Sequence, residues 1–285
     1  NLSKGLWPMR VIETVDEFRA ATSDIDRPLG LVPTMGALHD GHMSLVSRAR
    51  AESTTLAVSI FVNPTQFGPT EDYASYPRDI EADYARLDEA GVDLVLAPTT
   101  DEMYPAGSHT RVDVGSLSER LEGASRPGHF VGVATVVTKL LSIVRPDTAY
   151  FGQKDAQQGL MIWRLNADLN LGAQIVLCPI VREADGLALS SRNTGLSADE
   201  RRAATVLYKT LSAAGSMETD NAEQVRKRMR EIIEEEPLAT LDYVSVADPQ
   251  TLDELDVMKG SALALVAVRI GKTRLIDNMA IGSKT

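Results

Sequence analysis

Apolar and polar positions divide the first half of the chain into two kinds of segment. Short runs rich in β-branched residues predict buried strands, whereas longer amphipathic or apolar runs predict helices. The expected strands cover residues 29–34, 55–62, 92–98, 148–152 and 174–181. The expected helices cover residues 42–52, 80–91, 130–144 and 157–169. Because alternating strands and helices form parallel sheets covered on both faces, this half predicts an α/β, Rossmann-like, doubly wound sheet.

The pattern changes near residue 181. Two helical segments, 197–211 and 221–235, are followed by strand-like segments at 241–247 and 261–270. This order predicts a second, smaller α+β domain. We therefore expect a Rossmann-like domain over residues 1–180 and an α+β domain over residues 181–285.

Charge and composition narrow the classes of protein. A formal net charge of −11 argues against broad nucleic-acid binding, which needs a basic face, but leaves room for a small phosphate ligand. No apolar run approaches the roughly 18 residues needed to span a bilayer, and no secretory signal is visible, so a cytoplasmic protein without a membrane partner is expected. Residues 1–8 resemble a cloning remnant and carry no functional interpretation. The single cysteine, Cys178, lies in an apolar run and predicts a buried thiol.

The sharpest motif is VPTMGALHDGH at residues 32–42. An expected strand ends at Thr34, Gly36 permits a tight turn, and His39 and His42 open a helix. Residues three apart share a helix face, so both imidazoles can point toward a ligand at the positive end of the helix. The motif therefore predicts a polyphosphate site. A pair of surface histidines and a zinc site are the alternatives, although neither a cysteine cluster nor an HExxH pattern accompanies them.

HDGH resembles the His-x-Gly-His signature of the nucleotidyltransferase superfamily, which includes class I aminoacyl-tRNA synthetases. Further blocks make the chain similar to the pantoate–β-alanine ligase family from about residue 10 to residue 278. The blocks are VPTMGALHDGH, SIFVNPTQF (59–67), YPR (76–78), LEGASRPGHF (121–130), FGQKDAQQ (151–158), DGLALSSRN (185–193) and RLIDN (274–278).

The resemblance implies a two-step reaction. The carboxylate of pantoate attacks the α-phosphate of ATP to give pantoyl adenylate and pyrophosphate, and the amine of β-alanine then displaces AMP to give pantothenate. It also implies Mg²⁺ accompanying ATP, a homodimer, and a second domain that closes over the ATP site. Two other functions stay open: a nucleotidyltransferase of the same superfamily acting on another small substrate, and a nucleotide-binding module without catalysis.

The resemblance also implies roles for individual residues, in keeping with their chemistry. Cations and hydroxyl donors suit a phosphate that gains negative charge, and neutral amides suit pantoate because each both donates and accepts. The catalytic set is His39, His42, Lys154, Ser190, Ser191 and Arg192. ATP is expected to contact Met35, His42, Gly152, Lys154, Asp155, Val181, Leu189, Ser190, Ser191 and Arg192. Pantoate is expected at Gln66 and Gln158, and β-alanine at Asn63, Arg126 and His129.

Three further features complete the expectations. Gln153 stands where many relatives carry Glu. The loss of that carboxylate would matter if it held a metal or oriented Lys154, and we interpret the residue as lying behind those that touch the substrates; the metal ligands stay unknown. The long polar segment 67–79 predicts a lid over the reactive intermediate. GKT at residues 271–273 lacks the rest of a phosphate-binding loop and predicts a hairpin turn. RLIDN has no chemistry that the sequence alone suggests.

Overall fold

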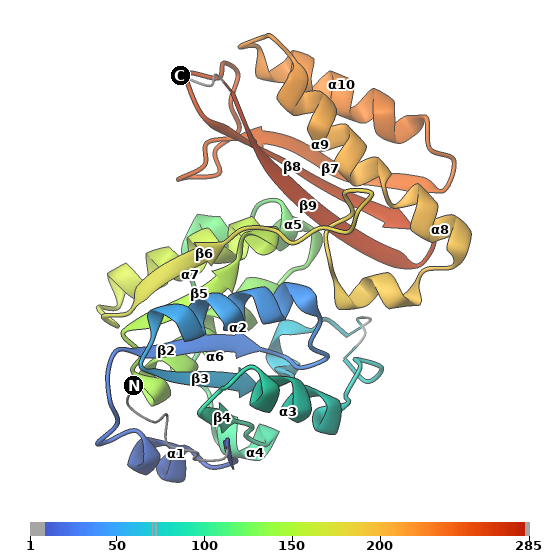
Figure 1. Cartoon of the computed structure of the whole chain (residues 1–285). Coiled ribbons are helices and arrows are strands. Elements are labelled where there is room, and N and C mark those ends of the chain that lie inside the picture. The colour runs from blue at the N-terminus through green and yellow to red at the C-terminus, as the bar shows by residue number, and fades with distance from the viewer. Residues whose placement is uncertain (1–8, 70, 72, 283–285) are drawn as a thin grey trace. The chain divides into compact units, whose positions relative to one another are not determined.

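The structure is a computed structural model that describes residues 9–69, 71 and 73–282, so residues 1–8 lie outside it. It divides into two compact units (Figure 1). The first unit comprises the described part of Asn1–Gly152 together with Met161–Cys178. The second unit comprises Gln153–Leu160 and the described part of Pro179–Thr285. Among the described residues, no helix is both long enough and apolar enough to cross a membrane.

A six-stranded parallel sheet forms the centre of the first unit, in the order β1-β4-β3-β2-β5-β6. All five strands expected from the sequence are present. Only β1, three residues long, was not expected. The strands are β1 (Arg10–Ile12), β2 (Leu29–Thr34), β3 (Thr55–Ile60), β4 (Leu94–Leu96), β5 (Thr148–Gly152) and β6 (Gln174–Cys178).

Helices connect these strands and cover both faces of the sheet. They are α1 (Val15–Ala21), α2 (Asp40–Glu52), α3 (Ile80–Glu89), α4 (Thr100–Met103), α5 (Glu122–Ser125), α6 (His129–Val144) and α7 (Ala156–Asp168), the last of which begins in the second unit. Short 3-10 helices lie at η1 (Pro64–Gln66) and η2 (Gly115–Ser118).

Alternate residues of each strand point to opposite faces, which produces two separate cores. Leu31 and Phe151 join the core beneath α6, whereas Val32 and Tyr150 join the core beneath α2 and α3. This two-sided burial confirms the doubly wound sheet.

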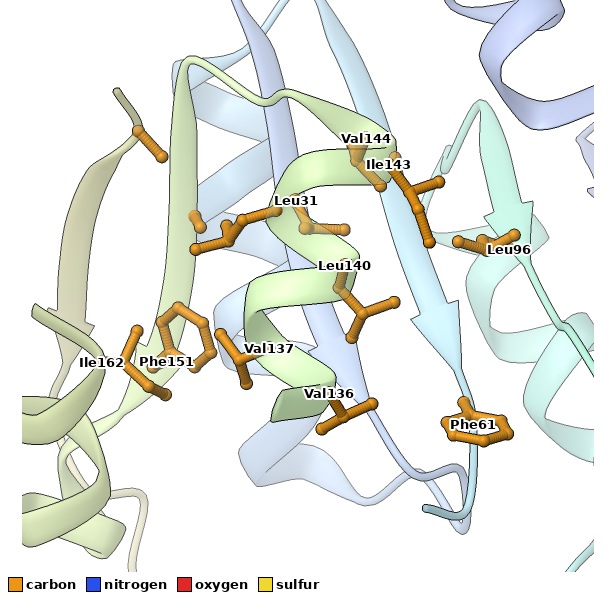
Figure 2. Packing of buried hydrophobic residues seen from close by; sticks show 14 of the residues in the cluster. Leu31, Phe61, Leu96, Val136, Val137, Leu140, Ile143, Val144, Phe151 and Ile162 are labelled. Atoms are coloured by element: carbon orange, nitrogen blue, oxygen red, sulfur yellow. The ribbon is translucent and has the colours of Figure 1, made fainter. Parts of the chain in front are cut away.

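Helix α6 is apolar almost all round because it lies at the centre of one of these cores. Figure 2 shows Val137 beside Phe151 and Ile162, with Leu140 one turn further along the helix. Gly132 of α6 has a separate role: a Cβ there would lie 2.3 Å from the carbonyl oxygen of Thr65. The glycine therefore allows η1 to lie directly against the helix.

The second unit contains a three-stranded antiparallel sheet in the order β7-β8-β9. Its strands are β7 (Ala239–Ala247), β8 (Ala262–Ile270) and β9 (Thr273–Ile281), and its helices are α8 (Ala198–Ala203), α9 (Val206–Ser216) and α10 (Ala222–Glu234). The 3-10 helices η3 (Gln153–Asp155) and η4 (Ser191–Gly195) also belong to it. Apolar side chains of the three helices and the sheet share one core.

One expectation for this unit was wrong, and one of its strands was not foreseen. The single helix expected over residues 197–211 is divided at Ala204 and Thr205, where the Thr205 hydroxyl donates to the carbonyl of Arg202 (2.8 Å) and competes with the helical ladder. Strand β9 was not expected, because Asp and Asn in its centre are poor strand formers. The hairpin turn at residues 271–273 is confirmed, since Ile270 pairs with Thr273 around Gly271.

Candidate active site

The turn between β2 and α2 is held in shape by a buried carboxylate. Asp83 of α3 accepts hydrogen bonds from the backbone N–H groups of Ala37 (2.8 Å) and Leu38 (2.7 Å). Gly36 has φ +80°, and a Cβ there would lie 2.8 Å from an Asp83 oxygen. The turn therefore needs glycine for both conformation and space. Asp83 is a supporting residue that the sequence analysis missed.

His39 and His42 cap the start of α2 reciprocally. The backbone N–H of Gly41 donates to Nδ1 of His39 (3.1 Å), and the backbone N–H of His39 donates to Nδ1 of His42 (3.3 Å). The two ring centroids are 4.1 Å apart. The structure thus brings together the two imidazoles that the motif placed on one face.

These bonds determine which nitrogen of each neutral ring carries the proton. Because Nδ1 of both His39 and His42 accepts, the proton resides on Nε2. Two Nε2–H donors at the positive end of a helix suit an anionic ligand. Within the described part of the chain, no three His, Cys, Asp or Glu side chains gather so as to hold a metal ion.

Gln66 lies at the end of η1, and its side chain contacts Asn63 and Met35. Its Oε1 accepts from Asn63 Nδ2 (3.0 Å), and its Nε2 lies 3.2 Å from the sulfur of Met35. Asn63 is 1% exposed, and its Oδ1 accepts from the hydroxyls of Thr65 and Tyr104, both at 2.9 Å. Three of the expected substrate contacts therefore lie together. The burial of Asn63 favours a role in orienting Gln66.

Arg126 and His129 form a second polar cluster in the first unit. Both oxygens of Glu71 accept from the Arg126 guanidinium (2.7 and 2.6 Å). Arg126 Nη1 lies 3.0 Å from His129 Nε2, and His129 Nδ1 lies 2.8 Å from the carbonyl oxygen of Gln66. The ion pair with Arg126 lowers the pKa of Glu71. Glu71, in the segment expected to be a lid, is another residue that the sequence analysis missed.

Burial, and then the neighbouring positive charge of Arg126, lower the pKa of His129 from 6.5 to about 4. A neutral imidazole is therefore favoured at this position at neutral pH. A histidine whose pKa is depressed by folding binds protons more weakly in the native state than in the unfolded state, so the native state is destabilised as the pH falls from 6.5 toward 4.

We expect the free energy of unfolding to fall by up to about 3 kcal/mol over this range because of His129. His129→Gln should remove that part of the pH dependence, measured as the difference in chemical denaturation between pH 6.5 and pH 4. His109→Gln, at an exposed position, is the matched control and should keep the wild-type dependence. An unchanged dependence in His129→Gln would contradict the burial argument.

The second unit holds the remaining expected residues except Gly152. Lys154 and Asp155 lie in η3, with Lys154 Nζ 3.6 Å from the Asp155 carboxylate. Gly152 ends β5 immediately before this turn, in the first unit, and Gln158 follows it in α7, half-buried.

A short hairpin carries two of the expected ATP contacts, Val181 and Leu189. The backbone N–H of Leu189 donates to the carbonyl of Val181 (3.0 Å), so the two residues lie side by side. Ser190 follows directly and caps η4, where its hydroxyl accepts from the backbone N–H of Arg192 (3.3 Å). Ser197 caps α8, as expected, through a hydrogen bond from the backbone N–H of Glu200 (3.3 Å).

RLIDN, which suggested no chemistry, supplies partners to both of these segments. Asp277 binds Arg182, which follows Val181, and Asn278 binds the turn that carries Lys154. Gln153 also has a partner here, because its side-chain N–H donates to Asn278 Oδ1 (3.1 Å). A polar pair in the middle of an otherwise apolar strand is the signal that could have pointed to these residues.

A doubly wound parallel sheet with two helix-capping histidines directly after one of its strands is typical of α/β enzymes of the nucleotidyltransferase type. The comparisons specify it further. A model of the family described as pantoate–β-alanine ligase matches residues 10–280. The chain belongs to this family and is an ATP-dependent ligase.

Individual relatives are similar to this chain along almost its whole length. A pantothenate synthetase of Roseiflexus castenholzii is 58% identical over 276 residues, covering 95% of this chain and 98% of the relative. The crystal structure of pantothenate synthetase from Thermus thermophilus superposes with a TM-score of 0.91 at 48% identity, covering 95% and 99% of the two chains. A Francisella tularensis pantoate–β-alanine ligase, solved with Beta-gamma ATP and β-alanine, gives a TM-score of 0.80 at 35% identity, covering 95% and 97%.

Proposed function

We propose that this chain joins pantoate to β-alanine with conversion of ATP to AMP and pyrophosphate, through a bound pantoyl adenylate. The observation that carries the proposal is the reciprocal capping of His39 and His42, in which Nδ1 of each ring accepts from the backbone at the start of α2. The family to which the chain belongs supplies the identity of the substrates.

In the first step, the carboxylate of pantoate attacks the α-phosphorus and pyrophosphate leaves. Negative charge grows on the phosphate oxygens, and preorganised donors stabilise it without having to reorganise. We assign this role to Nε2–H of His39 and His42 and to the ammonium of Lys154. Gln66 and Gln158 hold pantoate, and the segment from Ser190 to Arg192 binds the phosphates.

In the second step, the amine of β-alanine attacks the acyl carbon and AMP leaves. We place β-alanine near Arg126, whose guanidinium suits a carboxylate and is paired here with the carboxylate of Glu71. His129 and Asn63 support this region. A water-sensitive acyl adenylate also favours a lid role for residues 67–79, of which residues 70 and 72 lie outside the described part of the chain.

We propose that the Rossmann-like domain binds pantoate and that the α+β domain binds the nucleotide. Asp155 is assigned to the ribose, and backbone groups of Met35, Gly152, Val181 and Leu189 to the rest of ATP. Mg²⁺ enters with ATP, because this ion is held largely by substrate phosphates and water. A homodimer and a cytoplasmic location complete the proposal.

The test is isotope exchange. Labelled pyrophosphate should enter ATP when pantoate and Mg²⁺ are present and β-alanine is absent, because activation precedes the need for the amine. Exchange that required β-alanine would contradict an independent first step. Release of ADP and phosphate would indicate an acyl phosphate in place of an adenylate and would overturn the proposal.

Gln66→Ala is expected to raise the Michaelis constant for pantoate by about 5- to 150-fold while that for ATP changes little, because an unpaired buried polar group costs about 1–3 kcal/mol. Initial rates with each substrate varied in turn measure the difference. Gln224→Ala, in α10 of the second unit, is the control and should leave both constants unchanged. Equal effects of Gln66→Ala on the two substrates would remove Gln66 from the pantoate site.

A further inference from the structure

Strand β9 carries two buried polar residues in its centre, Asp277 and Asn278, each only 3% exposed. Leu275 and Ile281 place the odd-numbered positions of the strand on the face covered by the helices. Because successive residues of a strand point to opposite faces, Asp277 lies on that face and Asn278 on the other. The two adjacent side chains therefore reach different segments of the second unit.

Asn278 binds the turn that carries Lys154. Its Nδ2 group donates to the carbonyl oxygens of Gln153 and Lys154, both at 2.9 Å, and its Oδ1 accepts from the side chain of Gln153 (3.1 Å). Both N–H groups and the oxygen of the amide are thus used. Two fixed carbonyls orient the peptide planes of η3, and those planes determine the direction in which the Lys154 side chain leaves the backbone.

Asp277 binds the hairpin that carries Val181 and Leu189. Its carboxylate accepts from both Nη atoms of Arg182 (2.6 and 3.0 Å) and from the backbone N–H of Asn278 (2.7 Å). Such a bidentate pair fixes the guanidinium in the plane of the carboxylate.

Arg182 in turn fixes the hairpin. It donates to the carbonyl of Gly186 (3.0 Å), which lies at the tip of the hairpin, and its guanidinium lies 4.9 Å from the centre of the Tyr208 ring. Gly186 has φ +92°, and a Cβ there would come within 1.9 Å of that ring. Backbone hydrogen bonds therefore close the hairpin, and its Arg182 side chain contacts both Asp277 and Tyr208.

We propose that Asp277 and Asn278 are positioning residues for ATP. Asn278 holds the Lys154 turn and Asp277, through Arg182, holds the Val181–Leu189 hairpin. One dipeptide thereby sets the distance between the lysine that serves the phosphates and the hairpin backbone that is assigned to the rest of ATP. This inference rests on the proposed function, which assigns these two segments to ATP.

The variants are Asn278→Ala and Asp277→Asn, with Asp242→Asn as the matched control. Asp242 of β7 accepts from Arg274 of β9 (2.7 Å), so the control loses an ion pair between strands of the same sheet, outside both ATP segments. Circular dichroism identifies a temperature at which every variant is folded. Wild-type enzyme is tested first for pantoate-dependent exchange of pyrophosphate into ATP, and its failure there would refute the proposed function and not the positioning role.

If the wild-type enzyme is active, we expect each test variant to raise the Michaelis constant for ATP, or to lower the exchange rate, by about 10- to 100-fold. This is the effect expected when a positioned group is displaced by about 1 Å. The Michaelis constant for pantoate should change less than about twofold in both variants, because pantoate is assigned to residues that Asp277 and Asn278 do not hold. Asp242→Asn should match the wild type in all three quantities.

A purely structural role would lower the melting temperature and leave the kinetics of the folded enzyme unchanged, and this result would overturn the proposal. Equal changes for ATP and pantoate would also overturn it, because they would indicate general loosening. If Asn278→Ala does not fold, Asn278→Ser, which keeps one donor, is judged by the same criteria.

Discussion

Replacement of His39 or His42 by alanine is expected to lower turnover by about 10²–10³-fold, the effect of removing one preorganised donor to a transition-state charge. Each ring presents its Nε2 proton because its Nδ1 accepts from the backbone at the start of α2. The loss should appear in the rate of pyrophosphate exchange, since the donors act on the phosphate and not on the amine.

Stability separates this role from a purely structural one. Loss of a helix cap costs about 0.5–2 kcal/mol, so both variants should stay folded. Asn221→Ala removes the side-chain cap of α10 and is the matched control: it should lose similar stability and keep wild-type turnover. Near-normal turnover in either histidine variant would exclude that residue from the phosphate site.

Lys154→Met is expected to lower the exchange rate by about 10²–10³-fold, because it keeps most of the length of the side chain and removes the charge. The partly exposed ion pair with Asp155, at 3.6 Å, contributes less than about 1 kcal/mol to stability, so folding should be unaffected. Pre-steady-state formation of pantoyl adenylate measures the effect directly.

Lys209→Met is the control for this substitution. Lys209 is exposed on α9 and takes no part in the proposed site, so its replacement should leave the rate unchanged. If Lys154→Met formed the adenylate at the wild-type rate and slowed only the reaction with β-alanine, Lys154 would belong to the second step.

The sequence predicted the parallel sheet well because its strands are buried on both faces. Segments such as residues 29–34 and 148–152 are continuous apolar runs, and the structure places strands at the same residues. Local periodicity was less informative for β1, which is too short to show a pattern, and for β9, whose buried Asp277 and Asn278 interrupt the apolar run.

For the site too, features with a local sequence pattern were predicted and features that depend on tertiary contacts were not. His39 and His42 were predicted to lie together because they share one helix face, and their rings are adjacent. Asp83, Glu71 and Asn278 were missed, since each acts on residues more than forty positions away in the chain. Such contacts follow from tertiary packing, and no local spacing of residues predicts them.

The hydrogen bond between Asn278 and the Lys154 carbonyl joins residues 124 positions apart. On the ribosome, a chain that has been synthesised only as far as β8 contains all six strands of the parallel sheet and both histidines, but not the strand that fixes the lysine turn. An incomplete chain that stops before residue 277 would contain every strand of the larger sheet and lack the two side chains that hold the segments proposed to bind ATP.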